Sequence, residues 1–261
     1  MLTPMLHDPV FWAVAVVSVL ITGVSKGGFG GLALLAVPLM ALVISPVQAA
    51  GIMLPILIVM DWVSVWSYRK HWNKRVLMTM LPGALVGIVA GGLLASHVDD
   101  QFVRLCVGVI AIGFPLYVFS KTIFFKTFFN AKEQTSIAAG NTPLGVIAGT
   151  TAGFTSFVAH AGGPPYQAYA LSQGMEKQTY AGTSVMFFFI VNMVKVIPYA
   201  MIGQFDATNL TTSLILIPIA PIGVLLGVWL IKRIDQALFF KIIYTLIFCI
   251  GLRLLYSTIA V

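Results

Sequence analysis

Charged side chains are scarce in this sequence. They make up 9% of its 261 residues, against roughly 25% in ordinary soluble domains, whereas hydrophobic residues make up 59%. No polar stretch is long enough to form a separate soluble domain. These shortages exclude an ordinary soluble protein. They predict that residues 1–261 form a single domain immersed in a lipid bilayer.

Cysteine and metal-binding motifs are also nearly missing. Cys106 and Cys249 both lie in apolar stretches, where cysteine behaves as a small hydrophobic residue and not as part of a disulfide or metal pair. No His-Glu-x-x-His motif occurs. We therefore expect neither a metal nor a cofactor. A membrane-embedded enzyme that uses His160 and Asp61 as acid and base is the weakest of the functions considered.

The N-terminus lacks basic residues. Residues 1–9 include Asp8 but no Lys or Arg. A cleavable signal peptide begins with a positively charged region, so we expect these residues to remain in the mature protein.

Basic residues nevertheless outnumber acidic ones, 15 to 8, and most of them lie in short loops between apolar segments. Such a distribution sets membrane orientation, because loops rich in Lys and Arg stay in the cytoplasm, and it gives no indication of nucleic acid binding. The basic loops hold Arg69, Lys70, Lys74, Arg75, Lys121, Lys126, Lys132, Lys177, Lys232 and Arg233, and the alternate loops hold Asp8, Asp99, Asp100 and Asp206. We expect a multi-pass protein of a bacterial inner membrane with both termini on the periplasmic side.

Apolar runs separated by helix breakers predict ten helical segments, five in each half of the chain. They span about residues 10–25, 32–44, 49–66, 76–95 and 102–119, and then about residues 144–159, 164–172, 180–201, 211–231 and 237–256. The first two segments of each half are short. At 1.5 Å per residue they reach only about 14 to 24 Å, against a hydrocarbon core of about 30 Å. We expect the other six to cross the bilayer.

The two halves, residues 10–125 and 137–258, share residues in a common order. Ala50, Gly51, Asp61 and Tyr68 recur as Ala181, Gly182, Asn192 and Tyr199 at a constant offset of 131. Gly30, Gly31, Gly83, Gly87, Asp100 and Gln101 recur as Gly162, Gly163, Gly223, Gly227, Asp235 and Gln236 at offsets that drift by a few residues. Because each half has an odd number of segments, the second is turned over relative to the first. The sequence therefore predicts an inverted repeat.

The short segments predict two hairpins that enter from opposite sides of the membrane. Their tips are the breakers at residues 27–31, Gly-Gly-Phe-Gly-Gly, and at residues 160–165, His-Ala-Gly-Gly-Pro-Pro. The fold class is thus an all-α integral membrane protein with two inverted repeats of five segments, whose broken hairpins meet near the membrane centre.

Irregular backbone at that depth must line protein or water, so the tips are a candidate binding site. A helix begins after each tip, and its free N–H groups favour an anion. The alternative is that the glycines serve only close helix packing.

Five polar residues within apolar segments are candidates for that site. Lys26 directly precedes the first tip, and it either binds an anion or extends its ammonium group to the membrane surface. His160 lies at the second tip, where it either serves structure or couples transport to a proton. Asn192 and Lys195 are three residues apart and share a helix face. Asp61 is expected to pair with Lys26 or Lys195, or to accept a proton.

Uncharged donors near the second tip complete the predicted site. Gln167, Thr183 and Ser184 offer hydrogen bonds to an oxyanion, although Ser and Thr often bond to their own helix. The predicted substrate-binding residues are Lys26, Gly27, Gly28, Gly30, His160, Gly162, Gly163, Gln167, Thr183, Ser184, Asn192 and Lys195, with Asp61 and His160 as candidates for proton coupling.

These motifs resemble those of the TauE/SafE family, the sulfite exporter family of anion permeases. The resemblance rests on residues 23–31, Gly-Val-Ser-Lys-Gly-Gly-Phe-Gly-Gly, on Pro38, and on Gly149, Gly153, Gly162, Gly163, Pro164, Gly182, Thr183, Ser184, Asn192 and Lys195. It implies a transporter of sulfite, of sulfonates such as sulfoacetate, or of related anions, and it makes Lys26, Asn192 and Lys195 substrate-facing positions.

We therefore predict a secondary exporter of a small sulfur-containing or organic anion. It would work by alternating access, with coupling to protons or to the membrane potential left open. An anion channel is the main alternative. The expected partners are the anion and the lipid bilayer, and the sequence leaves open whether the protein is a monomer or a homodimer.

Overall fold

The structure is a computed structural model that describes residues 7–29, 32–95, 101–103, 105–113, 116, 142–230, 245, 248–253 and 255–256. Helices and the turns between them make up the described residues, with no strand among them. The helices are α1 (Pro9–Val24), a π-helical turn (Ser25–Phe29), a 3-10 helix (Leu32–Leu35), α2 (Ala36–Met40), α3 (Pro46–Tyr68), α4 (Lys74–Ala95), α7 (Thr142–Ala159), α8 (Gly163–Ala170), a 3-10 helix (Leu171–Gln173), α9 (Lys177–Met201), α10 (Ala207–Leu216) and α11 (Ile219–Leu230).

Among the described residues, four helices are long and apolar enough to cross a membrane, which confirms the prediction of a multi-pass membrane protein. They span Pro9–Gly27, Pro46–Trp66, Lys74–Leu94 and Gln178–Met201. The first of them differs from the expectation of a short segment. Its helix does not end at Ser25 but continues as a π-helical turn through Lys26 and the first glycines, and this adds the missing length.

The segment predicted at residues 211–231 is not one straight helix. It begins earlier and is divided into α10 and α11, which meet at an angle of 47° and make up a fifth candidate span. Pro218 lies in the break between them. Because proline has no N–H and its ring clashes with the preceding turn, the bend has a local cause.

Local sequence signals set where α1, α3 and α10 begin. The Asp8 side chain accepts a hydrogen bond from the Val10 N–H, and the Ser45 side chain accepts one from the Gln48 N–H. A proline follows each of these two caps, at the first helical position that proline favours. Asp206 caps α10 through the N–H groups of Thr208 and Asn209.

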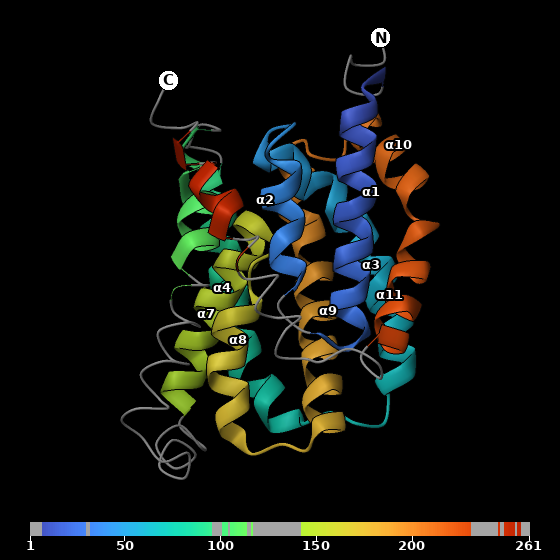
Figure 1. The fold of residues 1–261 in the computed structure, drawn as a ribbon. Coiled ribbons are helices and arrows are strands. Elements are labelled where there is room, and N and C mark those ends of the chain that lie inside the picture. The colour runs from blue at the N-terminus through green and yellow to red at the C-terminus, as the bar shows by residue number, and fades with distance from the viewer. Residues whose placement is uncertain are drawn as a thin grey trace.

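Two pairs of segments approach each other from opposite ends of the molecule. α2 packs against α1 near the end that holds the N-terminus, and α8 packs against α7 near the other end (Figure 1). The π-helical turn that follows α1 contacts α3, and His160, directly after α7, contacts Lys195 of α9. The bundle therefore brings the two predicted tips close to its two central helices.

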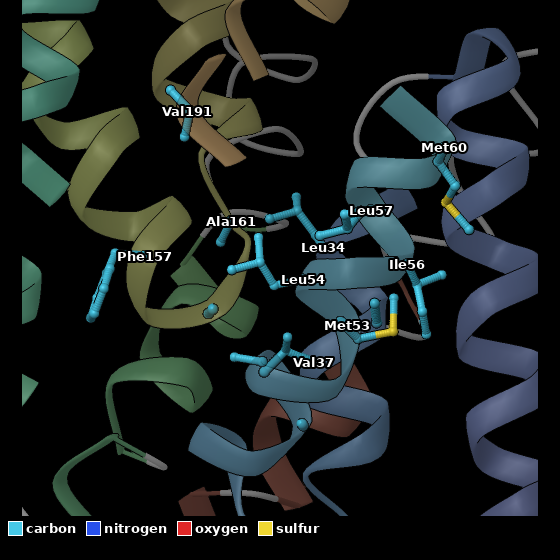
Figure 2. Close-up of a cluster of buried hydrophobic side chains, with 14 of the residues drawn as sticks. Leu34, Val37, Met53, Leu54, Ile56, Leu57, Met60, Phe157, Ala161 and Val191 are labelled. Carbon is cyan, nitrogen blue, oxygen red and sulfur yellow. The ribbon is translucent and has the colours of Figure 1, made fainter. Parts of the chain in front are cut away.

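Helix α3 is surrounded by protein on most sides. Met53, Ile56 and Met60 point toward α1, whereas Leu54 and Leu57 point toward the second tip (Figure 2). All five side chains are buried. Because side chains on different sides of α3 are buried by protein and not left to face lipid, α3 forms the axis of the core.

Glycine allows four helices to pack in two close pairs. A Cβ atom on Gly87 of α4 would lie 2.1 Å from the carbonyl oxygen of Thr150 in α7, and one on Gly153 would lie 2.2 Å from that of Ala84. The same close approach joins α1 to α11, where Cα of Gly223 lies 2.7 Å from a Cβ built on Gly23. Small residues permit such contact between membrane helices.

The α4–α7 contact gives a direct test of this packing. Gly87→Ala should lower the apparent melting temperature in detergent, with a loss of about 1–3 kcal/mol, because the methyl group forces the two helices apart. Gly113→Ala is the control, since its Cβ would meet no atom within 4 Å. Equal melting temperatures for the two variants would contradict the packing described here.

Candidate functional site

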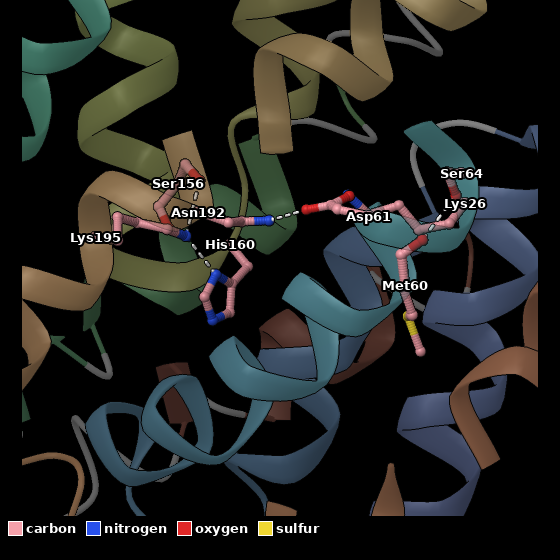
Figure 3. A network of polar contacts seen from close by, with 8 residues as sticks. All are labelled: Lys26, Met60, Asp61, Ser64, Ser156, His160, Asn192 and Lys195. Atoms are coloured by element: carbon pink, nitrogen blue, oxygen red, sulfur yellow. Dashed lines mark hydrogen bonds and ion pairs between the residues drawn. The ribbon is translucent and has the colours of Figure 1, made fainter. Parts of the chain in front are cut away.

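A buried carboxylate links the first tip to the centre of the bundle. Lys26, in the π-helical turn, forms an ion pair with Oδ1 of Asp61 on α3, and the Asn192 amide of α9 donates a hydrogen bond to Oδ2 at 2.6 Å (Figure 3). Asp61 is fully buried. Both of its oxygens are therefore occupied, and its charge offsets that of Lys26. The Lys26 ammonium also lies 5.5 Å from the centre of the Phe188 ring, in a cation–π contact.

A fully buried lysine, Lys195, lies about one turn after Asn192 along α9. Lys195 is 0% exposed, and its ammonium group lies 3.0 Å from the Ser156 carbonyl oxygen, 3.1 Å from the Ser156 hydroxyl and 2.7 Å from Nδ1 of His160. An ammonium group has three N–H donors, so all three are used. Ser156 lies in the last turn of α7, and His160 directly follows that helix (Figure 3).

The contacts of His160 place a hydrogen on its Nε2 atom. Its Nε2 lies 2.9 Å from the carbonyl oxygen of Ala50, which can only accept a hydrogen bond, so Nε2 carries a hydrogen. Nδ1 of the neutral ring is then the acceptor for Lys195. We assign His160 as the neutral Nε2–H tautomer and Lys195 as a charged ammonium group.

Lys195 is thus a buried cation whose hydrogen-bond partners are all neutral. Within the described part of the chain the single ion pair joins Lys26 to Asp61, and no carboxylate lies within ion-pair distance of Lys195. Partial compensation comes from the end of α7, because the last carbonyl groups of a helix carry negative charge. A buried cation held this way favours the approach of an anion.

The backbone of His160 adopts a left-handed conformation, with φ at 51°. Its N–H donates to the Ser156 carbonyl at 3.0 Å and closes the last turn of α7. Glycine is the usual residue at such a helix end, since it has no Cβ. The left-handed backbone of His160 therefore costs free energy for a residue with a side chain, and it is this conformation that is found together with the ring contacts to Ala50 and Lys195.

The structure brings five of the predicted site residues together. Lys26, Asp61 and Asn192 form one connected group, and Lys195 with His160 forms the adjacent group. The sequence left open whether Asp61 pairs with Lys26 or with Lys195, and the structure pairs it with Lys26.

The predicted tip glycines have different surroundings. Gly162 is tightly packed, because a Cβ there would lie 2.6 Å from the Ala152 carbonyl, whereas a Cβ on Gly163 would meet no atom within 4 Å. Gly27 and Gly28 lie in the π-helical turn beside Lys26, and Gly30 lies outside the described residues.

The helices after the tips offer fewer N–H groups than the sequence suggested. The first tip leads into a 3-10 helix and then the five-residue α2. In α8, Pro164 and Pro165 follow Gly163 and bring no N–H group. Side chains, more than helix ends, therefore supply the hydrogen-bond donors of this region.

The three uncharged candidates lie outside the cluster of charged residues. Thr183 accepts a hydrogen bond from the Asn73 N–H at 2.8 Å and donates one to the Thr179 carbonyl, so it holds the loop between α3 and α4. Gln167 on α8 is half-buried. Ser184, also half-buried, faces the hydroxyl of Tyr166, which is buried and has no hydrogen bond of normal geometry.

Sequence reasoning did not identify Ser156, Ala50 or Tyr166. Ser156 precedes His160 by one helical turn, and that spacing was a usable signal. The Ala50 carbonyl and the Tyr166 hydroxyl become relevant only through contacts between distant segments.

Gly23–Gly27 also matches the Gly-x-Ser-x-Gly pattern of hydrolase nucleophiles. That motif requires a strand before a sharp turn, but Ser25 follows α1 directly and begins the π-helical turn. The match therefore gives no support to an enzyme.

The left-handed residue gives a testable prediction. His160→Gly and His160→Ala both remove the imidazole, but only alanine keeps the unfavourable φ. We expect the glycine variant to be more stable than the alanine variant by about 1 kcal/mol, measured from thermal or denaturant unfolding in detergent. An alanine variant as stable as the glycine variant would show that residue 160 does not hold this conformation.

Comparison with known proteins identifies a family for the chain. No curated protein and no solved structure shows a significant match to the chain. A family model described as Sulfite exporter TauE/SafE matches residues 15–254, which include both tips and all five clustered residues. The chain belongs to the TauE/SafE sulfite exporter family, a family of membrane transporters.

Proposed function

We propose that the protein is a secondary exporter of a small sulfur-containing or organic anion, such as sulfite or a sulfonate. The observation that carries this proposal is the buried Lys195 ammonium group, whose hydrogen-bond partners are all neutral. A cation buried in a membrane protein costs several kcal/mol unless it is compensated. An anion bound beside Lys195 supplies that compensation.

The surrounding donors fit an oxyanion. An incoming oxygen takes the place of His160 Nδ1 as an acceptor for Lys195, and the Asn192 amide is three residues away on the same helix. The Lys26–Asp61 pair is nearby and neutral as a unit. The anion therefore meets one net positive charge. A singly charged sulfonate or hydrogensulfite ion matches this charge, and family membership supports the same class.

The burial of the cluster supports a carrier over an open channel. Asp61, Asn192 and Lys195 are each at most 3% exposed, and the Lys26 side chain is 12% exposed. An anion reaches Lys195 only if the surrounding helices move. Alternating access supplies that movement, because the site opens to one side at a time.

An inverted repeat supplies the mechanical basis in this proposal. Asp61 and Asn192 occupy equivalent positions of the two halves, and they bind each other. Equivalent residues meet only near a symmetry axis, which would then pass between α3 and α9. The pairing of α4 with α7 and of α1 with α11 supports the same relation, since each helix packs on a segment of the other half.

The charge distribution of the loops supports an orientation in which both termini lie on the periplasmic side of the cytoplasmic membrane. If the anion crosses alone, expelling one negative charge from an inside-negative cell releases about 2.3 kcal/mol per 100 mV, and the potential then favours export.

The site residues are tested by flux in proteoliposomes. Lys195→Met keeps the side-chain volume but removes the charge, and we expect at least a tenfold loss of sulfite and sulfonate transport, equivalent to about 1.4 kcal/mol. Lys26→Met should also reduce flux, because it leaves Asp61 without its cation. The control is Lys70→Met, at an exposed loop position. Unchanged flux in both site variants would show that the anion binds elsewhere.

Counterflow distinguishes a carrier from a channel. Vesicles preloaded with unlabelled substrate should transiently accumulate labelled substrate above its external concentration, since a carrier exchanges one for the other. Simple equilibration without an overshoot would establish a channel and overturn alternating access.

A further inference from the structure

We propose that His160 binds a proton when the anion binds, so that the protein moves one proton with each anion. This inference rests on the proposed anion site at Lys195. It concerns the ion that accompanies the cargo.

Both ring nitrogens of His160 are occupied in the structure. Nε2–H donates to the Ala50 carbonyl at 2.9 Å, and Nδ1 accepts from Lys195 at 2.7 Å. The ring therefore has no free lone pair. It can take a proton at Nδ1 only after the Lys195 ammonium group has turned away.

Charge prevents that protonation while the site is empty of anion. The ring faces Lys195 from α9, and Lys26 acts on it from the π-helical turn. An imidazolium ion here would add a second positive charge against a buried ammonium group. In the low dielectric of a protein interior such repulsion is strong.

Anion binding reverses both conditions. An oxyanion takes N–H donors of Lys195 and leaves the Nδ1 lone pair of His160 free. Its negative charge then favours an imidazolium ion, which donates Nδ1–H to an anion oxygen. Lys195 keeps its three protons throughout. The added proton enters the site from the side where the anion enters and leaves it on the side where the anion leaves, so both cross the membrane together. A monovalent sulfonate is therefore carried without net charge.

The other titratable groups near the ring are engaged elsewhere. Asp61 on α3 accepts from Lys26 and Asn192. Tyr199 on α9 stacks against the His160 ring at 6.3 Å between ring centres, but its hydroxyl donates to the Phe157 carbonyl at 2.6 Å. Among these groups, only in His160 does anion binding free an atom that can accept a proton, namely Nδ1, which Lys195 then releases.

Sulfonates of strong acids, such as methanesulfonate and isethionate, test the inference because they do not themselves take up protons between about pH 5.5 and 8. This pH range extends about one unit or more to each side of the ordinary pKa of histidine. Proteoliposomes with a pH dye inside and a clamped membrane potential would report both fluxes. We expect the lumen to lose about one proton per exported anion, and we expect the rate to be insensitive to the potential. Apparent affinity should fall by up to tenfold per pH unit as His160 becomes harder to protonate.

The matched variants are His160→Asn and His71→Asn. Asparagine tolerates a left-handed backbone but cannot carry the proton, and His71 is exposed in the loop after α3. We expect His160→Asn to lower the proton-to-anion ratio to near zero and to remove the pH dependence of affinity, and His71→Asn to keep both. The wild-type ratio alone is decisive if the variant is unstable.

The outcomes separate the two proposals. Sulfonate flux without proton movement, with a rate that follows the potential, would overturn proton coupling and leave the anion site intact. An unaltered ratio in a folded His160→Asn variant would place the proton on another group. Absence of flux for either sulfonate and for sulfite would overturn the proposed function and, with it, this inference.

Discussion

The Lys195 ammonium group and its three neutral acceptors impose the main constraint on this structure. A charged group in a membrane interior must have every donor satisfied, and here the end of α7 does this through the Ser156 carbonyl, the Ser156 hydroxyl and His160. Satisfied hydrogen bonds do not cancel the charge. The protein can therefore fold with the site empty, and the site still attracts an anion. A carrier needs both properties, because its site must bind the anion on one side of the membrane and release it on the other.

Backbone geometry places these groups. The helix break after α7 requires a residue in a left-handed conformation, and His160 occupies it with its ring between Ala50 and Lys195. Glycine contacts bring α7 against α4 closely enough to fix that break relative to α3 and α9. Substitutions far from the charged residues should therefore affect transport through helix position.

Sequence reasoning identified the residues that are conspicuous within their own segment. Lys26 and Lys195 interrupt apolar runs, Asn192 lies three residues before Lys195, and the glycine tips break the helices. It did not identify which lysine pairs with Asp61, nor the tautomer of His160, because both depend on contacts between segments far apart in the chain. The 47° bend at Pro218 was missed for a different reason, since proline within a membrane helix is often tolerated without one.

A structure with a bromine-labelled sulfonate tests the central claim most directly. Crystals grown with 2-bromoethanesulfonate would locate the ligand from the anomalous signal of bromine. The account predicts sulfonate oxygens within hydrogen-bond distance of the Lys195 ammonium group and no bound ligand in Lys195→Met crystals. A sulfonate bound away from Lys195, or retained unchanged in that variant, would contradict it.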